Sequence, residues 1–259
     1  MKPYYLLAVA VMGGSLAAQA QQNQSKAKPE DTEVWQPVPK SVTTSQQCLP
    51  PSDAVVLFDG KNLDQWASTK DPSQPAGWTV ENGVFTVKKG TGNIQTKQSF
   101  TDYQLHIEWR IPGHISGSGQ GRGNSGLFLA AIGGGDEGYE LQILDNYNNP
   151  TYVNGQSGSI YKQQAPLVNA NRPPGEWNVY DVVWTAPRFN TDGTLKSAAR
   201  VTVFFNGVLV QNNYELKGPT QYIGQAAYRK AHGAAPIRLQ DHGDPSEPIS
   251  FRNIWIRPL

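Results

Sequence analysis

The sequence contains a single cysteine, Cys48, so no disulfide can form within the chain and the fold has to be stabilised by its own core. It also lacks an excess of charge of either sign, because 22 basic residues stand against 21 acidic ones. This balance gives no electrostatic attraction to nucleic acid or to an anionic membrane surface. Only four histidines are present, and none has the H-x-x-H or H-E-x-x-H spacing of common metal sites. The sequence therefore predicts no cofactor, although a divalent metal ion is not excluded.

Apolar runs long enough to span a bilayer are missing as well. The apolar run from Tyr4 to Met12 follows Lys2 and is too short for a permanent membrane helix. Ala18-Gln19-Ala20 then has small residues at the two positions that a signal peptidase reads. We expect an export signal over residues 1–20, cleaved after Ala20, and a periplasmic or secreted protein with no membrane anchor; a short buried helix is the alternative. Residues 21–51 are polar and contain several prolines, which predicts a flexible leader.

Turn residues, in contrast, are plentiful, with 26 glycines and 19 prolines. Asn82-Gly83 and Asn206-Gly207 each separate two short runs rich in β-branched and aromatic residues, the strongest local signal of a β-hairpin. No stretch has a convincing helical period. We predict one all-β domain over residues 52–259, folded as an antiparallel two-sheet sandwich. The last strand, over residues 249–256, is expected to alternate strictly, with Phe251, Asn253 and Trp255 on one face.

Three predicted strands carry polar side chains on the face opposite their apolar one. In the strand that starts at Tyr139, for example, Tyr139, Leu141 and Ile143 share one face, and the intervening residues share the other. If the three strands are neighbours, their polar faces form a patch that can hold a polyhydroxylated ligand and move protons. The alternative is that each strand has an ordinary solvated outer face. The polar residues are Glu108 and Arg110; Glu140 and Gln142; and Arg238, Gln240 and His242.

Several motifs resemble those of the 3-keto-disaccharide hydrolase family, in the same order along residues 54–259. The resemblance implies a jelly-roll sandwich of the concanavalin A-like lectin and glucanase type, export in bacteria, and action on glycosides that carry a ketone at sugar C3. The motifs are Phe58-Asp59-Gly60-Lys61-Asn62-Leu63 with Trp66, Glu108-Trp109-Arg110, Asn124-Ser125-Gly126, Tyr139-Glu140 through Asp145, Pro173-Pro174-Gly175-Glu176-Trp177, and Gln240-Asp241-His242-Gly243 with Phe251-Arg252-Asn253-Ile254.

The activity that this resemblance implies suggests roles for individual residues. A C3 ketone acidifies the proton on C2, so that a base can remove it, the C1 substituent is expelled, and water adds back. This chemistry needs a base, a proton donor for the leaving oxygen, and groups that stabilise the enolate. Our hypothesis assigns Glu140 or His242 as base and proton shuttle. The expected substrate-binding residues are Arg110, Gln142 and Gln240 for the carbonyl and hydroxyl groups, Glu108 to orient Arg110, and Asn124 and Arg238.

Two other functions stay open at this point. A conventional glycoside hydrolase needs a pair of carboxylates, but positions 140, 142 and 144 read Glu, Gln and Leu, so its second acid would have to come from elsewhere, such as Glu108. A non-catalytic, lectin-like carbohydrate-binding module is compatible with the same sandwich. Such a module would need aromatic side chains on its binding face, for which the candidates are Trp66, Trp78, Tyr147, Tyr152 and Trp177.

Overall fold

The computed structural model of the chain describes residues 49–259. The predicted export signal, and the predicted leader up to residue 48, lie outside the described residues. Between residues 49 and 259, no helix is long and apolar enough to cross a membrane.

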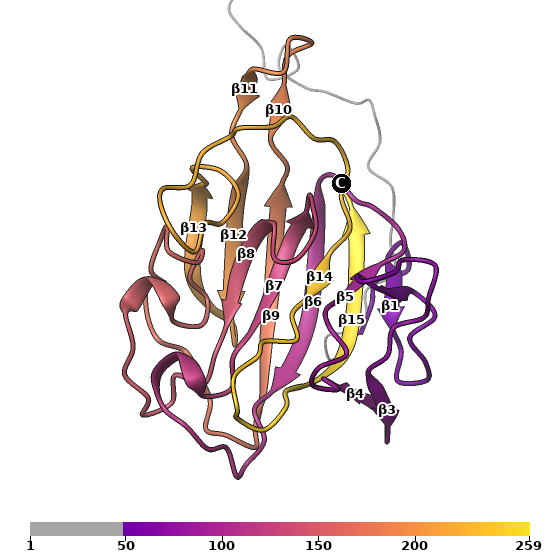
Figure 1. Cartoon of the computed structure of the whole chain (residues 1–259), viewed down its shortest axis with the longest axis vertical. Coiled ribbons are helices and arrows are strands. Elements are labelled where there is room, and N and C mark those ends of the chain that lie inside the picture. The colour runs from indigo at the N-terminus through magenta and orange to yellow at the C-terminus, as the bar shows by residue number, and fades with distance from the viewer. Residues whose placement is uncertain (1–48) are drawn as a thin grey trace, which may run out of the picture. The chain divides into compact units, whose positions relative to one another are not determined.

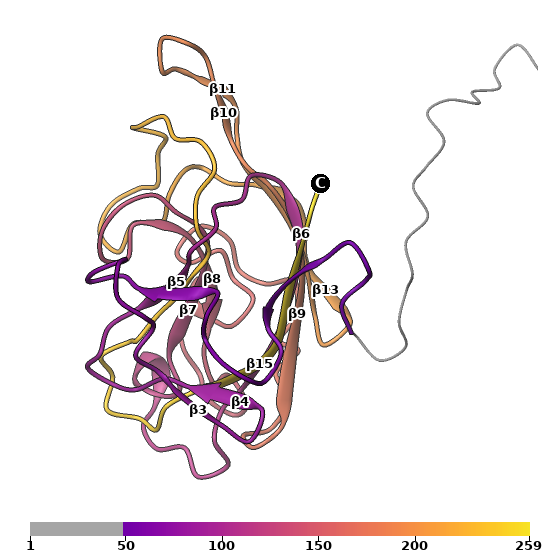
Figure 2. The same ribbon diagram turned by 90° about the vertical axis from the view of Figure 1, so that its right-hand side faces the viewer.

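Two antiparallel β-sheets make up the domain, and they form separate layers when viewed edge-on (Figures 1 and 2). The larger sheet has eight strands in the order β13-β12-β9-β6-β15-β4-β3, with β1 pairing to β15. The smaller sheet has five strands in the order β2-β5-β14-β7-β8. A hairpin of β10 and β11 and two short 3₁₀ turns, η2 and η3, complete the described elements. The predicted all-β jelly-roll sandwich is thus confirmed.

The strands of the larger sheet are β1 (Val55–Phe58), β3 (Thr79–Glu81), β4 (Val84–Thr86), β6 (Tyr103–Arg110), β9 (Trp177–Thr185), β12 (Arg200–Phe205), β13 (Val208–Glu215) and β15 (Ser250–Pro258). Those of the smaller sheet are β2 (Trp66–Ser68), β5 (Ile94–Thr96), β7 (Ser125–Ala131), β8 (Gly138–Ile143) and β14 (Arg238–Leu239). The remaining elements are β10 (Arg188–Phe189), β11 (Leu195–Ser197), η2 (Gly119–Gly121) and η3 (Val153–Gly155).

Both predicted Asn-Gly hairpins are present. Asn82 and Gly83, with φ of 51° and 79°, connect β3 to β4, and Asn206 and Gly207, with φ of 53° and 80°, connect β12 to β13. Positive φ at both central residues matches the right-handed twist of the paired strands, which is why this dipeptide is preferred there.

The core lies between the two sheets and is lined by the apolar faces that alternation predicts. On β6, Tyr103, Leu105, Ile107 and Trp109 are completely buried, and on β8 the residues Tyr139, Leu141 and Ile143 are buried in the same way. Each such side chain stabilises the fold by about 1.5–3 kcal/mol relative to an exposed one. The opposite faces of β6 and β8 therefore point away from the core, on the outer sides of the sandwich.

The predicted alternation of the last strand is wrong beyond Arg252. Asn253 has φ of 45°, and the register between β15 and β6 shifts between Arg252 and Trp255. A residue in this left-handed conformation inserts a β-bulge, which reverses the faces of the residues that follow. As a result Ile254 joins the core, whereas Trp255 lies on the outer face and stacks on His106 with ring centroids 5.2 Å apart.

Strand β8 is the last strand of the smaller sheet, and loop segments cover its free edge. Ser159 accepts a hydrogen bond from the Gln142 amide at 3.0 Å, and Tyr161 donates to the Glu140 carbonyl at 3.1 Å. Thr220 donates to the Gly138 carbonyl at 2.7 Å. The long connection between β8 and β9 and the loop after β13 are thereby fixed beside the outer face of β8.

Candidate active site

The smaller sheet brings two of the three predicted polar strands together. β8 and β14 both pair with β7, so their outer faces are separated by only one strand. β6, which carries Glu108 and Arg110, belongs to the larger sheet. Alternation shows which face of a strand is polar, but it does not show to which sheet the strand belongs.

A cavity of about 180 Å³ opens on the outer face of the smaller sheet. Five of the predicted residues line it, and four further residues from the surrounding loops and strand ends complete the wall. The lining residues are Asn124, Asp136, Glu140, Gln142, Tyr161, Thr220, Tyr222, Gln240 and His242. This group is called the polar pocket below.

Glu140 projects into the polar pocket from the middle of β8 and is only 6% exposed. Its backbone amide donates to Thr220 Oγ1 at 3.1 Å, which fixes the strand at this point. Burial raises the pKa of the Glu140 carboxyl to about 8, the negative charge of Asp136 adds to the effect, and no hydrogen bond from a described residue lowers it. The carboxyl group therefore carries a proton for most of the time at neutral pH, and it can give up that proton near pH 8.

Gly126 on the adjacent strand β7 makes room for this carboxyl group. A Cβ atom at position 126 would lie 2.5 Å from Glu140 Oε1 and 3.2 Å from its Cδ. A side chain at this position would force the Glu140 carboxyl group to move, so Gly126 leaves free the space that this rotamer of Glu140 occupies.

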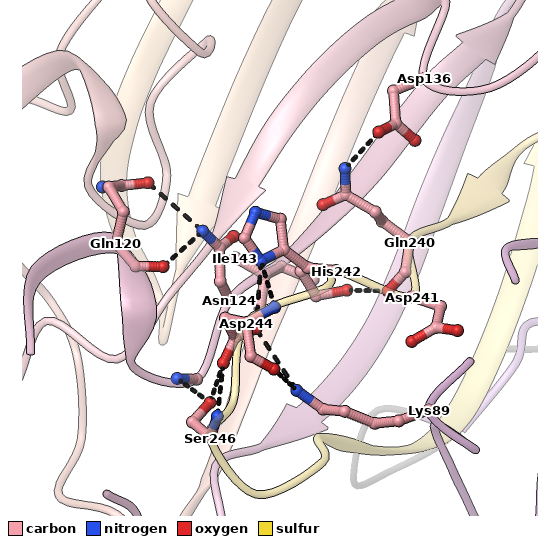
Figure 3. A network of polar contacts seen from close by, with 12 residues as sticks. Lys89, Gln120, Asn124, Asp136, Ile143, Gln240, Asp241, His242, Asp244 and Ser246 are labelled. Atoms are coloured by element: carbon pink, nitrogen blue, oxygen red, sulfur yellow. Dashed lines mark hydrogen bonds and ion pairs between the residues drawn. The ribbon is translucent and has the colours of Figure 1, made fainter. Parts of the chain in front are cut away.

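Two glutamine side chains line the polar pocket with their amide nitrogens already engaged. Gln142 Nε2 donates to Asn124 Oδ1 at 2.9 Å, and Gln240 Nε2 donates to Asp136 Oδ2 at 2.9 Å. Asn124 is itself held through Nδ2, which donates to the Gln120 carbonyl at 2.8 Å (Figure 3). The oxygens Oε1 of Gln142 and Gln240 have no partner among the described residues. Buried acceptors of this kind are usually satisfied, so both are available to ligand hydroxyl groups.

His242, just beyond β14, is oriented by Asp244 (Figure 3). The imidazole Nδ1 lies 3.1 Å from Asp244 Oδ2, and Asp244 also bonds Ser246 and lies 3.4 Å from Lys89 Nζ. Burial by itself would raise the pKa of Asp244, but the bonds to His242 and Ser246 and the Lys89 charge lower it to about 2. A carboxylate that is ionised at neutral pH thus fixes the ring through Nδ1, which also lies 3.3 Å from the Asp244 backbone amide, and no described residue is hydrogen-bonded to Nε2.

Arg238 lies on the same sheet but does not line the polar pocket. It is 3% exposed, and its guanidinium donates to the carbonyls of Gly133 and Gly135 and, at 3.1 Å, to Gln95 Oε1. These bonds hold the glycine-rich turn before β8, and this turn carries Asp136. In the structure Arg238 supports the pocket wall, whereas the sequence suggested a contact with substrate.

Glu108 and Arg110 lie on the outer face of the larger sheet, away from the polar pocket. Glu108 accepts hydrogen bonds from Arg252 Nε at 2.6 Å and from Asn253 Nδ2 at 2.8 Å. The guanidinium of Arg110 stacks over Trp177, 4.7 Å from the ring centroid. The expected orientation of Arg110 by Glu108 is therefore wrong, because that carboxylate is bound instead by Arg252, its direct partner on β15, and by Asn253 from the bulge.

Four lining residues were not anticipated from the sequence: Asp136, Tyr161, Thr220 and Tyr222. Asp136 follows the three glycines that precede β8, a position that could have indicated a pocket-edge carboxylate. Tyr161 lies in the long connection between β8 and β9, and loops of such length in compact domains are often functional. Thr220 and Tyr222 lie in a loop with no sequence signal, and only the tertiary fold places them here.

The residues of the described domain contain no group of three or more His, Cys, Asp or Glu side chains that could hold a metal ion. Of the aromatic residues considered for a binding module, Trp66 and Trp78 are buried in the core. Trp177 lies beneath Arg110 and Arg252 on the larger sheet. Tyr147 and Tyr152 are 39% and 41% exposed, and Tyr152 lies near the polar pocket, since its hydroxyl bonds that of Tyr161 at 2.6 Å.

Comparisons with known proteins show the family of the chain and support its fold. The family model described as a 3-keto-alpha-glucoside-1,2-lyase-like domain matches residues 53–257. A proposed glycosyl hydrolase from Parabacteroides distasonis ATCC 8503 is 55% identical, with a TM-score of 0.83 over 91% of this chain and 98% of that one. Another proposed glycosyl hydrolase from the same organism is 21% identical, with a TM-score of 0.56 over 80% of this chain and 99% of that one, and shares the fold. The comparison with curated proteins found no match.

Proposed function

Because the chain belongs to the family of 3-keto-alpha-glucoside-1,2-lyase-like domains, we propose that it cleaves glycosides whose sugar ring carries a ketone at C3. The family and the 55% identical glycosyl hydrolase relative support a carbohydrate-active function. The 3-keto substrate and the reaction steps below are our proposal for the polar pocket.

In the first step, His242 Nε2 removes the proton from C2, and the electron pair passes into the C3 carbonyl to give an enolate. Asp244 stabilises the imidazolium that forms, in the same way that it orients the neutral ring. The amide groups of Gln142 and Gln240 bind the ring hydroxyls, and protonated Glu140 gives its proton to the oxygen on C1. The C1–O bond breaks as the enolate collapses, which leaves a C1=C2 double bond conjugated with the ketone.

In the second step, water adds to C1 and the proton returns to C2. Glu140, now ionised, takes the proton from the attacking water, and the His242 imidazolium gives its proton back to C2. The products are the free alcohol and a 3-keto sugar, and both side chains regain their starting protonation states. Each proton that is removed is thus returned within one turnover.

The observation that supports this proposal most strongly is the burial of the Glu140 carboxyl group in the polar pocket. Its carboxyl group is buried without a hydrogen-bond donor among the described residues, and its pKa is about 8. A carboxyl group that stays protonated at neutral pH suits a proton donor to a leaving oxygen. The ionised Asp244 carboxylate orients the His242 ring, and this arrangement suits His242 as the base that removes a proton.

The test is to incubate the protein with a glucoside and with its 3-keto counterpart and to follow release of the alcohol. Cleavage of the 3-keto glycoside alone is the expected result, because the unoxidised sugar has no acidic proton on C2. Glu140→Gln should abolish this release, whereas the control Glu81→Gln, at an exposed position of β3, should not change it. If Glu140→Gln remained fully active in a folded protein, the role of Glu140 would be refuted.

A conventional glycoside hydrolase is a second candidate, and one observation favours it. Asp136, which the sequence analysis did not consider, lines the polar pocket with Glu140 and raises its pKa, so the second carboxylate missing from β8 is supplied by the preceding turn. A general acid with a raised pKa and a second carboxyl group in the same site are the arrangement that such enzymes use. Cleavage of the unoxidised glucoside, lost in Asp136→Asn, would support this candidate.

Export is proposed from the sequence alone. The apolar run, the small residues at positions 18 and 20 and the polar segment that follows predict cleavage after Ala20 and a periplasmic or secreted protein. N-terminal sequencing of the protein produced in a bacterial host should begin at Gln21. An intact Met1 on the mature protein would contradict this.

A further inference from the structure

Two of the amide side chains that line the polar pocket have no amide proton left for a ligand. Gln142 Nε2 donates to Asn124 Oδ1 at 2.9 Å and to the Ile143 carbonyl at 3.3 Å. Asn124 Nδ2 donates to the carbonyl and to the side-chain oxygen of Gln120, at 2.8 and 3.4 Å (Figure 3). The proposed reaction places a negative charge on the C3 oxygen of the sugar, and this charge needs a hydrogen-bond donor that these amides do not supply.

Apart from the acid and the base of the proposed reaction, four lining residues still have a proton to donate. Gln240 is already assigned to the ring hydroxyl groups. Tyr222 is 72% exposed, so water competes for its hydroxyl group. Thr220 Oγ1 lies against the backbone of β8, because it accepts a hydrogen bond from the Glu140 amide at 3.1 Å. The remaining donor is the hydroxyl group of Tyr161.

Tyr161 is directed into the polar pocket by its pairing with the edge of β8. Its backbone amide donates to the Glu140 carbonyl at 3.1 Å, and the preceding residue, Ile160, pairs antiparallel with Leu141. Ile160 and Leu141 are both completely buried in the core, and successive side chains of an extended segment point to opposite faces. The side chain of Tyr161 therefore lies on the same outer face as the carboxyl group of Glu140.

The contacts of the Tyr161 hydroxyl group hold it in place and still leave it a proton to donate. Its oxygen lies 2.6 Å from that of Tyr152, so the two hydroxyl groups share one hydrogen bond and have two protons between them. When Tyr152 donates to Tyr161, the proton of Tyr161 is free for a ligand. Lys162 Nζ lies 5.7 Å from the centroid of the Tyr161 ring, which places a positive charge beside this pair.

Tyr161 keeps its proton at neutral pH. Burial raises the pKa of its hydroxyl group above the ordinary value of 10.0, and the hydrogen bond to Tyr152 and the nearby charge of Glu140 add to the effect. The hydroxyl group therefore stabilises a neighbouring negative charge as a hydrogen-bond donor and does not take part in proton transfer.

We propose that the Tyr161 hydroxyl group is a further catalytic group, which donates a hydrogen bond to the C3 oxygen of the substrate and stabilises the enolate. This inference rests on the proposed function. When His242 Nε2 takes the proton from C2, the electron pair of the C2–H bond forms a C2=C3 double bond, and the carbonyl electron pair moves onto the C3 oxygen. Tyr161 keeps its own proton, so the proton balance of the reaction is unchanged.

The test uses 1,5-anhydro-3-keto-glucitol, a 3-keto sugar with no substituent on C1 that could leave. In deuterium oxide the wild-type protein should exchange the C2 proton for deuterium, because exchange needs only the base and the enolate, and ¹H NMR follows it. The His242 side chain is 36% exposed, so the proton that it takes is replaced from the solvent. Tyr161→Phe should slow both this exchange and the cleavage of a 3-keto glucoside roughly 10²-fold.

Two further variants complete the test. Tyr214→Phe, at a half-buried position of β13 in the larger sheet, is the matched control and should change neither rate. Tyr152→Phe removes the hydrogen-bond partner of Tyr161 and should slow the exchange about threefold, and it serves if Tyr161→Phe does not fold.

The exchange reaction separates this inference from the proposed function. If Tyr161→Phe exchanges the C2 proton as fast as wild type, the inference is overturned and the proposed function stands, even where cleavage is slowed, because Tyr161 would then act after the enolate has formed. A loss of exchange in Tyr222→Phe but not in Tyr161→Phe would assign the donor to Tyr222 and also overturn the inference. A wild-type protein that catalyses neither exchange nor cleavage would refute the proposed function and the inference together.

Discussion

The outer faces of the two sheets carry the same kinds of polar side chain, but these side chains differ in how many hydrogen-bond and ion-pair partners they have within the protein. On the larger sheet, His106, Glu108 and Asn253 form a polar cluster, and on the smaller sheet the polar pocket contains His242, Glu140 and two glutamines. Each set has an imidazole, a carboxyl group and at least one amide. The difference lies in how many of these groups already have a partner within the protein.

On the larger sheet the charges are paired. Glu108 accepts from Arg252 and Asn253, and although burial alone would raise its pKa, hydrogen bonds from His106, Asn253 and Arg252 lower it to about 2. Burial alone would likewise lower the pKa of His106, but its bonds to Asp181 and Glu108 raise it to about 9. Both groups are thus charged at neutral pH and held by each other, as expected for a structural ion network.

In the polar pocket, by contrast, His242 is paired with Asp244, but the other groups that face the cavity are not fully paired. Glu140 has no hydrogen-bond donor among the described residues, and the oxygens of Gln142 and Gln240 accept from none of them. These groups lose solvent without gaining a protein partner, which costs stability and is tolerated where a ligand supplies the missing bonds. The comparison indicates that pairing within the protein distinguishes the polar pocket from the structural network, whereas residue type does not.

The largest expected effect is the difference in kcat between variants of the two carboxyl groups, Glu140 and Glu108. Glu140→Gln should lower kcat for a 3-keto glycoside by roughly 10³-fold, because a positioned proton-transfer group usually contributes a rate factor of about this size. Glu108→Gln, assayed at a temperature where the variant is folded, should keep kcat within about threefold of wild type, because Glu108 lies on the other sheet. Comparable losses in both variants would show that the larger sheet takes part in the reaction.

The free energy of unfolding should respond in the opposite way, with a larger loss in Glu108→Gln than in Glu140→Gln. Glu108→Gln should lower the free energy of unfolding by about 2 kcal/mol at pH 7, because the buried His106 loses one of its carboxylate partners and the ion pair to Arg252, whose side chain is 42% exposed, is removed. The folded-state pKa of Glu108 is about 2, below its ordinary 4.5, so its contribution is complete above pH 4.5 and is lost as the pH falls towards 2. The difference in denaturant midpoint between wild type and variant should therefore shrink from pH 7 to pH 3. A constant difference would contradict an ionic origin.

Gly126→Ala tests whether the rotamer of Glu140 matters. The added methyl group would clash with Glu140 Oε1 and force the carboxyl group to move, while the rest of the polar pocket is unchanged. We expect kcat to fall by about 10²-fold, in line with displacement of a catalytic group by about 1 Å. Gly193→Ala, where nothing lies near the added Cβ atom, is the control for a glycine replacement, although its φ of 84° makes the backbone strained. If the activity of Gly126→Ala were unchanged, the reaction would not depend on the position of the Glu140 carboxyl group.

The smallest expected effect concerns the orientation of His242. Asp244→Asn keeps the shape of the side chain but removes the charge next to Nδ1, and kcat should fall roughly tenfold with KM almost unchanged. A rise in KM without a change in kcat would instead place Asp244 in substrate binding.

Much of this architecture could be predicted from the sequence, because it depends on local pattern. The Asn-Gly hairpins and the alternation of Tyr103 to Trp109 follow from backbone preference and from period, which act over a few residues. The placement of Glu108 could not be predicted, since it depends on which sheet receives β6. The bulge at Asn253 also escaped prediction, because a left-handed asparagine has no distinctive neighbours in the sequence.

The polar pocket itself was half predictable. Glu140, Gln142, Gln240 and His242 were found from the alternation predicted around positions 140 and 240, and the structure places these two segments on either side of β7. Asp136, Tyr161, Thr220 and Tyr222 come from turns and long connections whose paths are set by pairing with the edge of β8, a tertiary contact that no local pattern encodes.

The measurement that tests the central claim most directly is the titration of the glutamate side-chain carboxyl groups by ¹³C NMR, with Glu140→Gln and Glu108→Gln used for assignment. The wild-type protein should show one carboxyl group that titrates near pH 8 and disappears in Glu140→Gln. It should also show one that stays ionised down to about pH 2 and disappears in Glu108→Gln. A Glu140 carboxyl group that titrates near its ordinary value of 4.5 would contradict the account, because the polar pocket would then hold no proton to donate at neutral pH.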